Sequence, residues 1–186
     1  MTDSGKKLIR KEIIARLKGQ DKERQWAKSR IIQDKLFACE VFIQARVVMF
    51  YVSKDEEVDT HRMIKKALDI GKRVVVPYSV SETNQIIASE LENPELDLEL
   101  GIYGIYQPKK SALREIPVES IDLVIVPGVA FDKKNYRLGR GRGYYDRFLR
   151  KLNPGAYTIG ICFDLQLVGD LPKDSHDLPV SRVITN

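Results

Sequence analysis

The sequence predicts an α/β protein, a three-layer sandwich whose helices cover both faces of a largely parallel β-sheet. Apolar runs at 46–52 and 73–77 flank a helical pattern at about 60–70. A strand, a helix and a second strand within about thirty residues form a βαβ unit, which implies a parallel pair. A third run, 121–126, is apolar except for one residue, as expected of a strand buried on both faces. This alternation of strands and helices predicts the layered fold.

Two helices are predicted ahead of the first strand. Apolar residues between Leu8 and Leu17 lie on one helical stripe, and Gly19 is the expected C-cap. A second helix is expected to begin near Asp21 and to run to about Leu36. The chain would then enter the strand at 46–52.

The later elements follow from the same signals. Asp59 and Thr60 are expected to cap the crossover helix, which would end at Gly71. Beyond the strand at 73–77, a further strand is predicted at 84–90 and a loop at 93–108, where Pro and Gly occur. After 121–126, the prediction is a long loop over 127–143, a helix over about 144–152, and strands at 157–163 and 183–185.

Length and composition place further bounds on the protein. The 186 residues fit one domain, taken as 1–186, and an apolar fraction of 43% allows a sizeable core. No apolar run is long enough to span a bilayer, and the N-terminus lacks the apolar segment of a signal peptide. Cys39 and Cys162 have no metal-ligand spacing and are expected to be small buried residues in a reducing compartment. A cytoplasmic protein without membrane contact is therefore expected.

The net charge of +5 is distributed unevenly along the chain. Residues 1–30 contain ten Lys or Arg and four Asp or Glu, and residues 133–151 contain eight and one. Residues 86–122 show the reverse, with three basic and eight acidic residues. Such clustering indicates an anionic ligand rather than a generally basic surface. RNA is the obvious rival ligand, although the sequence carries no aromatic-interleaved RNA-binding signature.

The most informative segment is 137–146, with the sequence Arg-Leu-Gly-Arg-Gly-Arg-Gly-Tyr-Tyr-Asp. Its alternating glycines leave backbone N–H groups open to a ligand, because no Cβ stands in the way. The arginines between them are rigid forks that suit phosphate oxygens, and the helix expected from about Tyr144 would point its N-terminus at the same anion. Asp146 stands where a metal that accompanies a polyphosphate could be held. Together these features predict a nucleotide phosphate site.

Familiar motifs and simpler interpretations fit this segment less well. Tyr144 occupies the position where a Rossmann motif needs its last glycine, and the sequence has no Gly-Lys-Ser or Gly-Lys-Thr of a P-loop. Glycine and arginine also alternate in solvated turns and in disordered nucleic-acid-binding segments. Such segments rarely lie between a buried strand and a helix.

The flanks make the match more specific. The stretches 126–132 (Val-Pro-Gly-Val-Ala-Phe-Asp) and 136–149 resemble the 5-formyltetrahydrofolate cyclo-ligase family, also called methenyltetrahydrofolate synthetases. Residues 6–10 resemble the family's N-terminal K-x-x-x-R, residues 50–53 with 57–60 resemble its folate-pocket segment, and His176-Asp177 resembles its C-terminal H-D. Two positions depart from the family pattern: Arg142 replaces a usual Lys, and Ser181 replaces an Asp that often follows the H-D pair. The first departure keeps the charge but changes its geometry.

This resemblance implies both a fold and a reaction. The fold is the one shared by ribose-5-phosphate isomerase, glucosamine-6-phosphate deaminase and CoA-transferases. The reaction converts 5-formyltetrahydrofolate and ATP to 5,10-methenyltetrahydrofolate, ADP and phosphate. Because an N-formyl oxygen is a poor leaving group, transfer of the γ-phosphoryl group to that oxygen would prepare the carbon for attack by N10. The protein must then position two anionic ligands and neutralise charge on the transferring group.

The resemblance also implies which residues form the site. The residues expected to bind ATP are Lys6, Lys7, Arg10, Arg137, Leu138, Gly139, Arg140, Gly141, Arg142, Gly143, Tyr144 and Tyr145. Those expected to contact the reduced folate are Val52, Glu57, Arg140, Gly141, Arg142, Gly143 and Tyr144. The catalytic candidates are Arg140, Arg142 and Tyr145, and the candidate Mg²⁺ ligands are Asp146 and Asp177.

Simpler roles stay open for several of these residues. Arg137 and Arg142 could pair with surface carboxylates, and Asp146 could cap its own helix. Lys6 and Arg10 lie one helical turn apart, as they would on any solvated helix end. One of the two tyrosines is expected only to pack, because neighbours on a helix point in different directions.

Three classes of function compete. The first is the ATP-dependent folate cyclo-ligase, the second is another small-molecule enzyme of the same sheet family, and the third is a basic RNA-binding module. A phosphosugar enzyme should carry a well-placed base, which is not evident near the loop, and an RNA-binding module should show steep salt dependence. The sequence therefore predicts the cyclo-ligase, a monomer that uses ATP and Mg²⁺, acts on a reduced folate and binds no nucleic acid.

Overall fold

The computed structural model describes residues 2–101, 104–174 and 176–186, and its centre is a six-stranded sheet in the order β11-β9-β6-β1-β2-β3. Neighbouring strands are parallel except β2 and β3, which pair antiparallel. The strands are β1 (Val47–Met49), β2 (Arg73–Val80), β3 (Gln85–Leu91), β6 (Leu123–Val126), β9 (Tyr157–Cys162) and β11 (Arg182–Thr185). The predicted α/β class and largely parallel sheet are confirmed, whereas the likeness to the ribose-5-phosphate isomerase group stays a prediction.

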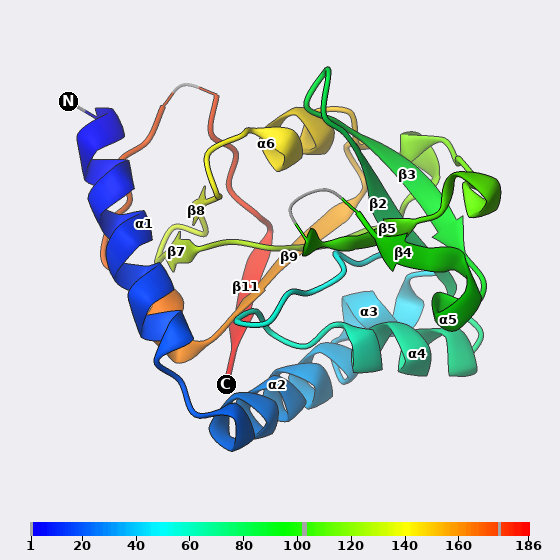
Figure 1. Ribbon diagram of the computed structural model, residues 1–186, viewed down its shortest axis with the longest axis horizontal. Coiled ribbons are helices and arrows are strands. Elements are labelled where there is room, and N and C mark those ends of the chain that lie inside the picture. The colour runs from blue at the N-terminus through cyan, green and yellow to red at the C-terminus, as the bar shows by residue number, and fades with distance from the viewer. Residues whose placement is uncertain (1, 102–103, 175) are drawn as a thin grey trace.

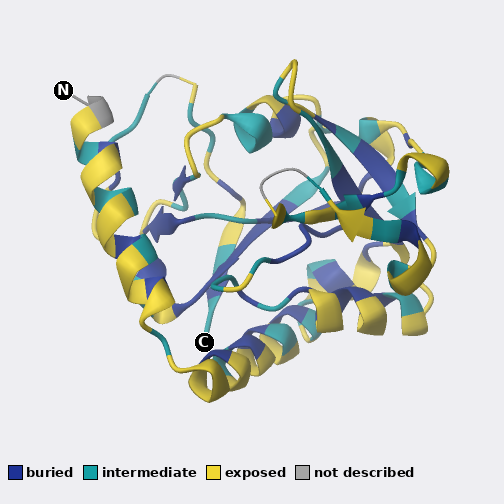
Figure 2. Ribbon diagram, viewed as in Figure 1, coloured by how far each residue is buried: buried dark blue, intermediate teal, exposed yellow. Residues whose placement is uncertain are grey.

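Helices cover both faces of this sheet (Figure 1). The helices are α1 (Thr2–Lys18), α2 (Lys22–Phe37), α3 (Glu40–Gln44), α4 (His61–Asp69), α5 (Pro94–Asp97) and α6 (Tyr144–Leu149). Buried residues of α1, α2 and α4 pack on one face together with Val48 of β1, and those of α6 pack on the other face with Val47 and Met49. Successive residues of one strand thus serve two cores, and Figure 2 shows the sheet interior as the most buried part.

Local chemistry explains where the helices begin and end. The Asp21 carboxylate accepts the N–H of Arg24 at 3.0 Å and caps α2. At α4 the Asp59 carboxylate accepts the N–H of His61 at 2.9 Å, while the side chain of Thr60 makes no cap bond. Gly71 ends this region in the left-handed conformation, with φ of +79°. Of the two predicted caps of α4, only Asp59 therefore acts as one.

Short elements that depend on tertiary contacts were missed or misjudged by the sequence prediction. The stretch 93–108, predicted as loop, contains α5, β4 (Leu98–Leu100) and β5 (Tyr106–Pro108), while residues 102 and 103 lie outside the described residues. The predicted loop 127–143 contains β7 (Ala130–Asp132) and β8 (Arg137–Leu138), which form a second sheet with β10 (Leu167–Val168). Helix α3 was not predicted, and α6 ends three residues earlier than expected. Such short strands gain their stability from packing, so their own sequence gives little signal.

The described residues also include single turns of 3₁₀-helix, which are η2 (Lys110–Ala112), η3 (Val118–Ser120) and η4 (Asp164–Gln166). Both cysteines are free thiols; Cys162 is buried as predicted, whereas Cys39 is only half-buried. Within the described ranges, no helix has the length and apolar character needed to cross a membrane.

Candidate active site

A cavity of about 710 Å³ opens where β1 and β6 end. Tyr51 and Val52 reach it from the chain that follows β1, and residues 127–129 reach it from the chain that follows β6. Its other walls come from α1, the segment 137–143, α6 and residues near the C-terminus. Parallel sheets bind ligands at the carboxyl ends of their strands, so this cavity is the candidate active site.

The segment between β6 and α6 is organised by a buried carboxylate, Asp132. β7 and β8 pair as an antiparallel hairpin, whose turn holds Asn135 at a φ of +63°. Asp132 Oδ1 accepts the N–H groups of Lys134 and Tyr136, each at 2.9 Å, and Oδ2 accepts that of Leu171 at 3.3 Å. Burial opposes the charge of Asp132, but these donors outweigh it and hold the pKa of this carboxyl below its ordinary value. The hairpin therefore fixes the position at which the following residues, 137–143, begin.

Residues 137–143, called here the glycine-arginine loop, need glycine at two positions. Gly141 has a φ of +100° and Gly143 a φ of +68°, in the region that side chains rarely adopt. A Cβ on Gly143 would lie 2.9 Å from Nη1 of Arg147, and a Cβ on Gly141 would lie 3.5 Å from Cζ of Arg10. The expected conformational role of glycine is therefore present, and the loop backbone lies next to cationic side chains.

The three arginines of the loop differ in their burial and in their contacts. Arg137 is buried, pairs with the carboxylate of Asp146 and lies over the ring of Tyr145, with 5.7 Å from Cζ to the ring centroid. Arg140 is half-exposed, and its Nη2 lies 3.1 Å from Glu57 Oε1. Arg142 is exposed and lines the cavity. Arg137 therefore pairs with a carboxylate, which was the simpler role left open for it, but the pair lies inside the site rather than on the surface.

Helix α1 brings two cations to the same cavity. Lys6 is buried, and its Nζ lies 2.7 Å from Asp174 Oδ2 and 2.6 Å from Asp177 Oδ2. Burial works against the ammonium charge, but the two carboxylates outweigh it and raise the pKa of Lys6. Arg10 donates from Nε to the carbonyl of Gly139 at 2.9 Å. Neither residue is on an ordinary solvated helix end, whereas Lys7 is exposed and is not among the residues that line the cavity.

On the opposite wall, Glu57 lies in a loop that its own backbone closes. The Glu57 N–H donates to the carbonyl of Lys54 at 2.8 Å, and the Lys54 N–H donates to Glu57 Oε2 at 3.0 Å. Ser53 and Thr60 fix the base of the loop, since each donates its N–H to the hydroxyl of the other, at 2.9 and 3.0 Å. Val52 is almost fully buried, belongs to the main core cluster and also lines the cavity, so its contact with a ligand stays a prediction beside its core role.

Both tyrosines at the start of α6 line the cavity. Tyr145 packs against both core clusters, and among the described residues its buried hydroxyl has no hydrogen-bond partner. Burial raises the pKa of Tyr145, so the hydroxyl keeps its proton at neutral pH. An unpaired buried hydroxyl is costly in a folded protein, and a ligand group in the cavity would satisfy it.

The two candidate metal ligands are both on the cavity wall, as a shared ion would require. Asp146 pairs with Arg137, and Asp177 pairs with Lys6. Ligand atoms of Asp174, His176 and Asp177 lie within 4.8 Å of one another. Carboxylate oxygens suit Mg²⁺, so Asp174 and Asp177 could hold this ion, whereas Asp146 is not a member of this group. Because the Lys6 ammonium contacts the Asp177 oxygen, a magnesium ion on that oxygen would have to displace it.

Some cavity residues were not predicted from the sequence. Arg147 donates from Nε and Nη2 to the carbonyl of Asn84, and Arg150 donates from Nη2 to the carbonyl of His176 at 2.7 Å. Both line the cavity, Arg147 from α6 and Arg150 from the residue that caps its C-terminus, and their spacing of three residues from each other was the available signal. Ser181, one of the departures from the family pattern, instead bonds Thr158 of β9 and is not among the cavity residues.

The fold and this cavity, with a cationic loop at the edge of a parallel sheet, are those expected of an enzyme that binds small anionic ligands. The chain belongs to the 5-formyltetrahydrofolate cyclo-ligase family, whose sequence model matches residues 2–186. The mouse (Mus musculus) 5-formyltetrahydrofolate cyclo-ligase is 28% identical over 98% of this chain and 94% of its own. The Escherichia coli K12 protein of the same name is 33% identical over 77% of this chain and 79% of its own.

Solved structures agree with the sequence relatives. The 5,10-methenyltetrahydrofolate synthetase of Aquifex aeolicus matches with a TM-score of 0.84 and 29% identity, covering 96% of this chain and 88% of that chain. The synthetase of Mycoplasma pneumoniae matches with a TM-score of 0.78 and 25% identity, covering 97% and 98%. The predicted family and enzyme class are confirmed, and family membership supports the use of ATP.

Proposed function

We propose that the chain converts 5-formyltetrahydrofolate and ATP to 5,10-methenyltetrahydrofolate, ADP and phosphate in the cavity at the ends of β1 and β6. One observation carries the proposal: the glycine-arginine loop, the carboxylate of Glu57 and the hydroxyl of Tyr145, which has no partner among the described residues, meet in a single cavity. The cationic loop suits the phosphates, and the carboxylate suits the N–H donors of a pterin. Both reactants would thereby be held side by side.

The phosphates of ATP would lie along the glycine-arginine loop. Its backbone can approach closely at Gly141 and Gly143, and Arg140 and Arg142 lie on the cavity side. Lys6 and Arg10 add positive charge from α1. Cations in such positions stabilise the charge that develops on a transferring phosphoryl group. Lys7 and Arg137 would act less directly, since Lys7 is exposed and Arg137 pairs with Asp146.

The reduced folate would lie between Val52, Glu57 and the tyrosines. The Glu57 carboxylate would accept hydrogen bonds from the pterin amino group and ring N–H. For it to do so, Arg140 must leave Oε1, and it would then be available to the phosphoryl group. The Tyr145 hydroxyl, protonated and unpaired among the described residues, would donate to the formyl oxygen or accept from N10.

The chemistry follows from these positions. The formyl oxygen takes the γ-phosphoryl group of ATP, with Arg140 and Arg142 neutralising the equatorial oxygens. N10 then attacks the formyl carbon and gives up its proton, which the departing phosphate can accept, and phosphate leaves with the former carbonyl oxygen. Asp146, with Asp177 if Lys6 moves away, would hold Mg²⁺, which neutralises charge on the β- and γ-phosphates.

We further infer a single-domain, monomeric, cytoplasmic enzyme that does not bind nucleic acid. The two basic segments of the chain, 1–30 and 133–151, both contribute to the wall of one cavity. That arrangement supports a small anionic ligand over an extended polyanion.

The direct test follows the absorbance of the methenyl product when purified protein is mixed with ATP and 5-formyltetrahydrofolate, with phosphate release measured in parallel. One phosphate should appear for each product, and ADP in place of ATP should give none. The Arg140→Ala variant serves as the control for a contaminating enzyme. Equal product formation by the parent protein and this variant would contradict the proposed site, and none by the parent would contradict the function.

A further inference from the structure

The core-facing stripe of α2 contains two polar residues where apolar ones would be expected. Its buried positions are Gln25, Ser29, Ile32 and Leu36, which follow the spacing of one helix face. Ile32 and Leu36 pack into the core, but Gln25 and Ser29 bury an amide and a hydroxyl. Buried polar groups destabilise a fold unless they are hydrogen-bonded, so these two require specific partners.

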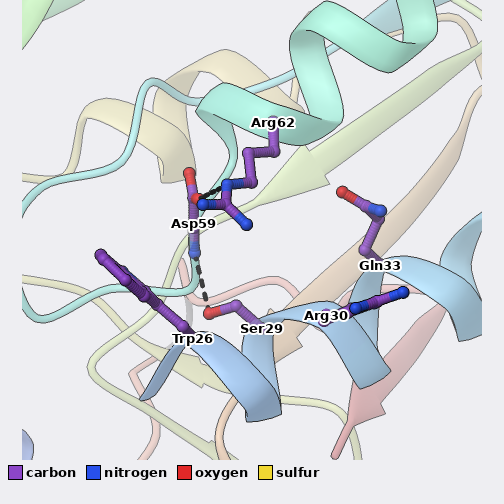
Figure 3. Close-up of a pocket in the computed structure, with 6 residues that line it drawn as sticks. All are labelled: Trp26, Ser29, Arg30, Gln33, Asp59 and Arg62. Carbon is purple, nitrogen blue, oxygen red and sulfur yellow. Dashed lines mark hydrogen bonds and ion pairs between the residues drawn. The ribbon is translucent and has the colours of Figure 1, made fainter. Parts of the chain in front are cut away.

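Their partners are backbone groups of the loop that carries Glu57. The Gln25 amide donates from Nε2 to the carbonyl of Asp55 at 2.8 Å and to the carbonyl of Glu57 at 3.1 Å. Ser29 Oγ accepts the N–H of Asp59 at 3.2 Å, a bond drawn in Figure 3. One face of α2 thus holds three backbone groups of residues 55–59.

These bonds act on the side of the loop that faces away from the cavity. Figure 3 shows a separate hollow beside the contact of Ser29 with Asp59, lined also by Trp26 and Arg62. Its volume is about 120 Å³, and the Arg62 guanidinium lies 5.6 Å from the Trp26 ring centroid. The hollow is not shared with the main cavity, of which Glu57 is a lining residue. The loop therefore stands between α2 on one side and the folate pocket on the other.

We propose that Gln25 and Ser29 are positioning residues for folate recognition, because they set the place of the Glu57 backbone and so of its carboxylate. The inference rests on the proposed function, in which Glu57 reads the pterin. Within its own loop, Glu57 is held by Lys54 at its N–H and carboxylate and by the Ser53–Thr60 pair at the base. From other parts of the chain, Arg140 contacts its carboxylate and Gln25 donates to its carbonyl. Of these, only Gln25 contributes its hold from outside the loop and outside the site.

The main test is Gln25→Leu, which keeps a similar volume and removes both donors. The carbonyls of Asp55 and Glu57 then lose the Gln25 donor. The Asp55 carbonyl keeps the Lys22 ammonium at 3.2 Å, so the loss falls mainly on the Glu57 carbonyl, and this part of the loop should shift to reach water. The KM for 5-formyltetrahydrofolate should rise about tenfold, within the range expected for an unpaired buried acceptor, while the KM for ATP stays within twofold. Ser29→Ala, a milder change that removes one acceptor, should give a smaller rise in the same direction.

The matched control is Ile32→Ala on the same stripe of α2. This residue is fully buried, so its truncation should destabilise the protein by about 2–5 kcal/mol without removing a hydrogen bond to the loop. Its KM values for both substrates should match those of the parent at a temperature where both proteins are folded. A folate-specific rise in Ile32→Ala would overturn the inference, because it would trace the effect to general destabilisation.

A double-variant cycle separates this inference from the proposed function. In a Glu57→Gln background, Gln25→Leu should add little to the folate KM, because the group that it positions is already altered. Full additivity, or an equal rise in both KM values for Gln25→Leu, would refute positioning through Glu57 even if the parent enzyme is active. Absence of activity in the parent would instead refute the proposed function. If Gln25→Leu does not fold, Ser29→Ala decides by the same comparison of KM values.

Discussion

Replacing Gly143 with alanine should weaken ATP binding far more than the addition of one methyl group suggests. Gly143 has a φ of +68°, and an L-residue in that conformation costs roughly 1–2 kcal/mol. The new Cβ would also lie 2.9 Å from Nη1 of Arg147. Arg147 is a flexible side chain, but it is tied to the carbonyls of Asn84 and Arg142, at 2.9 and 2.6 Å from Nη2. Moving it would weaken these bonds, at about 0.5–1.5 kcal/mol each.

Because the flexible Arg147 side chain would weaken these two bonds rather than lose them, the expected penalty on the native loop is about 2–3 kcal/mol, the lower part of the summed range. If the loop relieves this strain by adopting another conformation that does not bind ATP, ATP affinity should fall by roughly 30- to 150-fold. Calorimetry with a non-hydrolysable ATP analogue measures this directly, and the KM for ATP checks it during turnover. Gly143→Asn should lose less, since asparagine tolerates the left-handed region better than alanine does.

Gly169→Ala is the matched control, because a Cβ there would meet nothing within 4 Å and its φ lies outside the left-handed range. Its ATP affinity should equal that of the parent. Circular dichroism must show that Gly143→Ala is folded. An ATP affinity within threefold of the parent in that folded variant would refute the role given to the loop backbone.

Four further predictions address other parts of the site and its frame. Arg140→Ala and Arg142→Ala should each lower kcat by up to the order of a thousandfold, the effect of losing a cation that stabilises the phosphoryl group, with little change in melting temperature. Arg142→Lys should stay active, and near-normal kcat in both alanine variants would contradict the role given to these arginines. Glu57→Gln should raise the KM for folate and leave ATP affinity nearly unchanged, since its half-exposed Arg140 pair contributes at most about 1 kcal/mol; equal losses for both ligands would place Glu57 outside the pterin pocket. Asp146→Asn should raise the Mg²⁺ concentration needed for half-maximal rate, and a titration that matches the parent would leave Asp146 only its pairing with Arg137. The pKa of Asp132 is lower in the folded than in the unfolded protein, so its charge stabilises the fold above about pH 4, and this stabilisation is lost as the pH falls through the folded-state pKa. The difference in unfolding free energy between the parent and Asp132→Asn, measured with urea, should therefore shrink from pH 7 to about pH 3, and a constant difference would contradict this.

The sequence alone determined the features that depend on short stretches of chain. Strands β1, β2 and β6 were predicted because apolar runs record burial on both faces of a sheet, residue by residue. The parallel arrangement followed from the helix between two of them. The glycine-arginine loop was recognised for a similar reason, since a backbone conformation that only glycine adopts easily leaves glycine in the sequence at Gly141 and Gly143.

Pairings between distant residues were decided only by the tertiary structure. The sequence places Arg140 in the loop and Glu57 after β1, but it does not indicate that their side chains meet at 3.1 Å. The same holds for Lys6 and Asp177, which lie at opposite ends of the chain and pair at 2.6 Å. A charged residue pairs with whatever partner the fold brings near it, and periodicity along the chain carries no record of that partner.

The short strands inside the predicted loops illustrate the same division. β7 and β8 have only three and two residues, too few for a pattern, and they form because Asp132 closes their turn and β10 completes their sheet. Likewise, Gln25 and Ser29 in sequence are two polar residues on a helix, and only packing shows that they face inward to the Glu57 loop. Periodicity in the sequence determines which local structure a segment adopts, whereas burial of a polar group and the identity of its partner depend on the whole chain being folded.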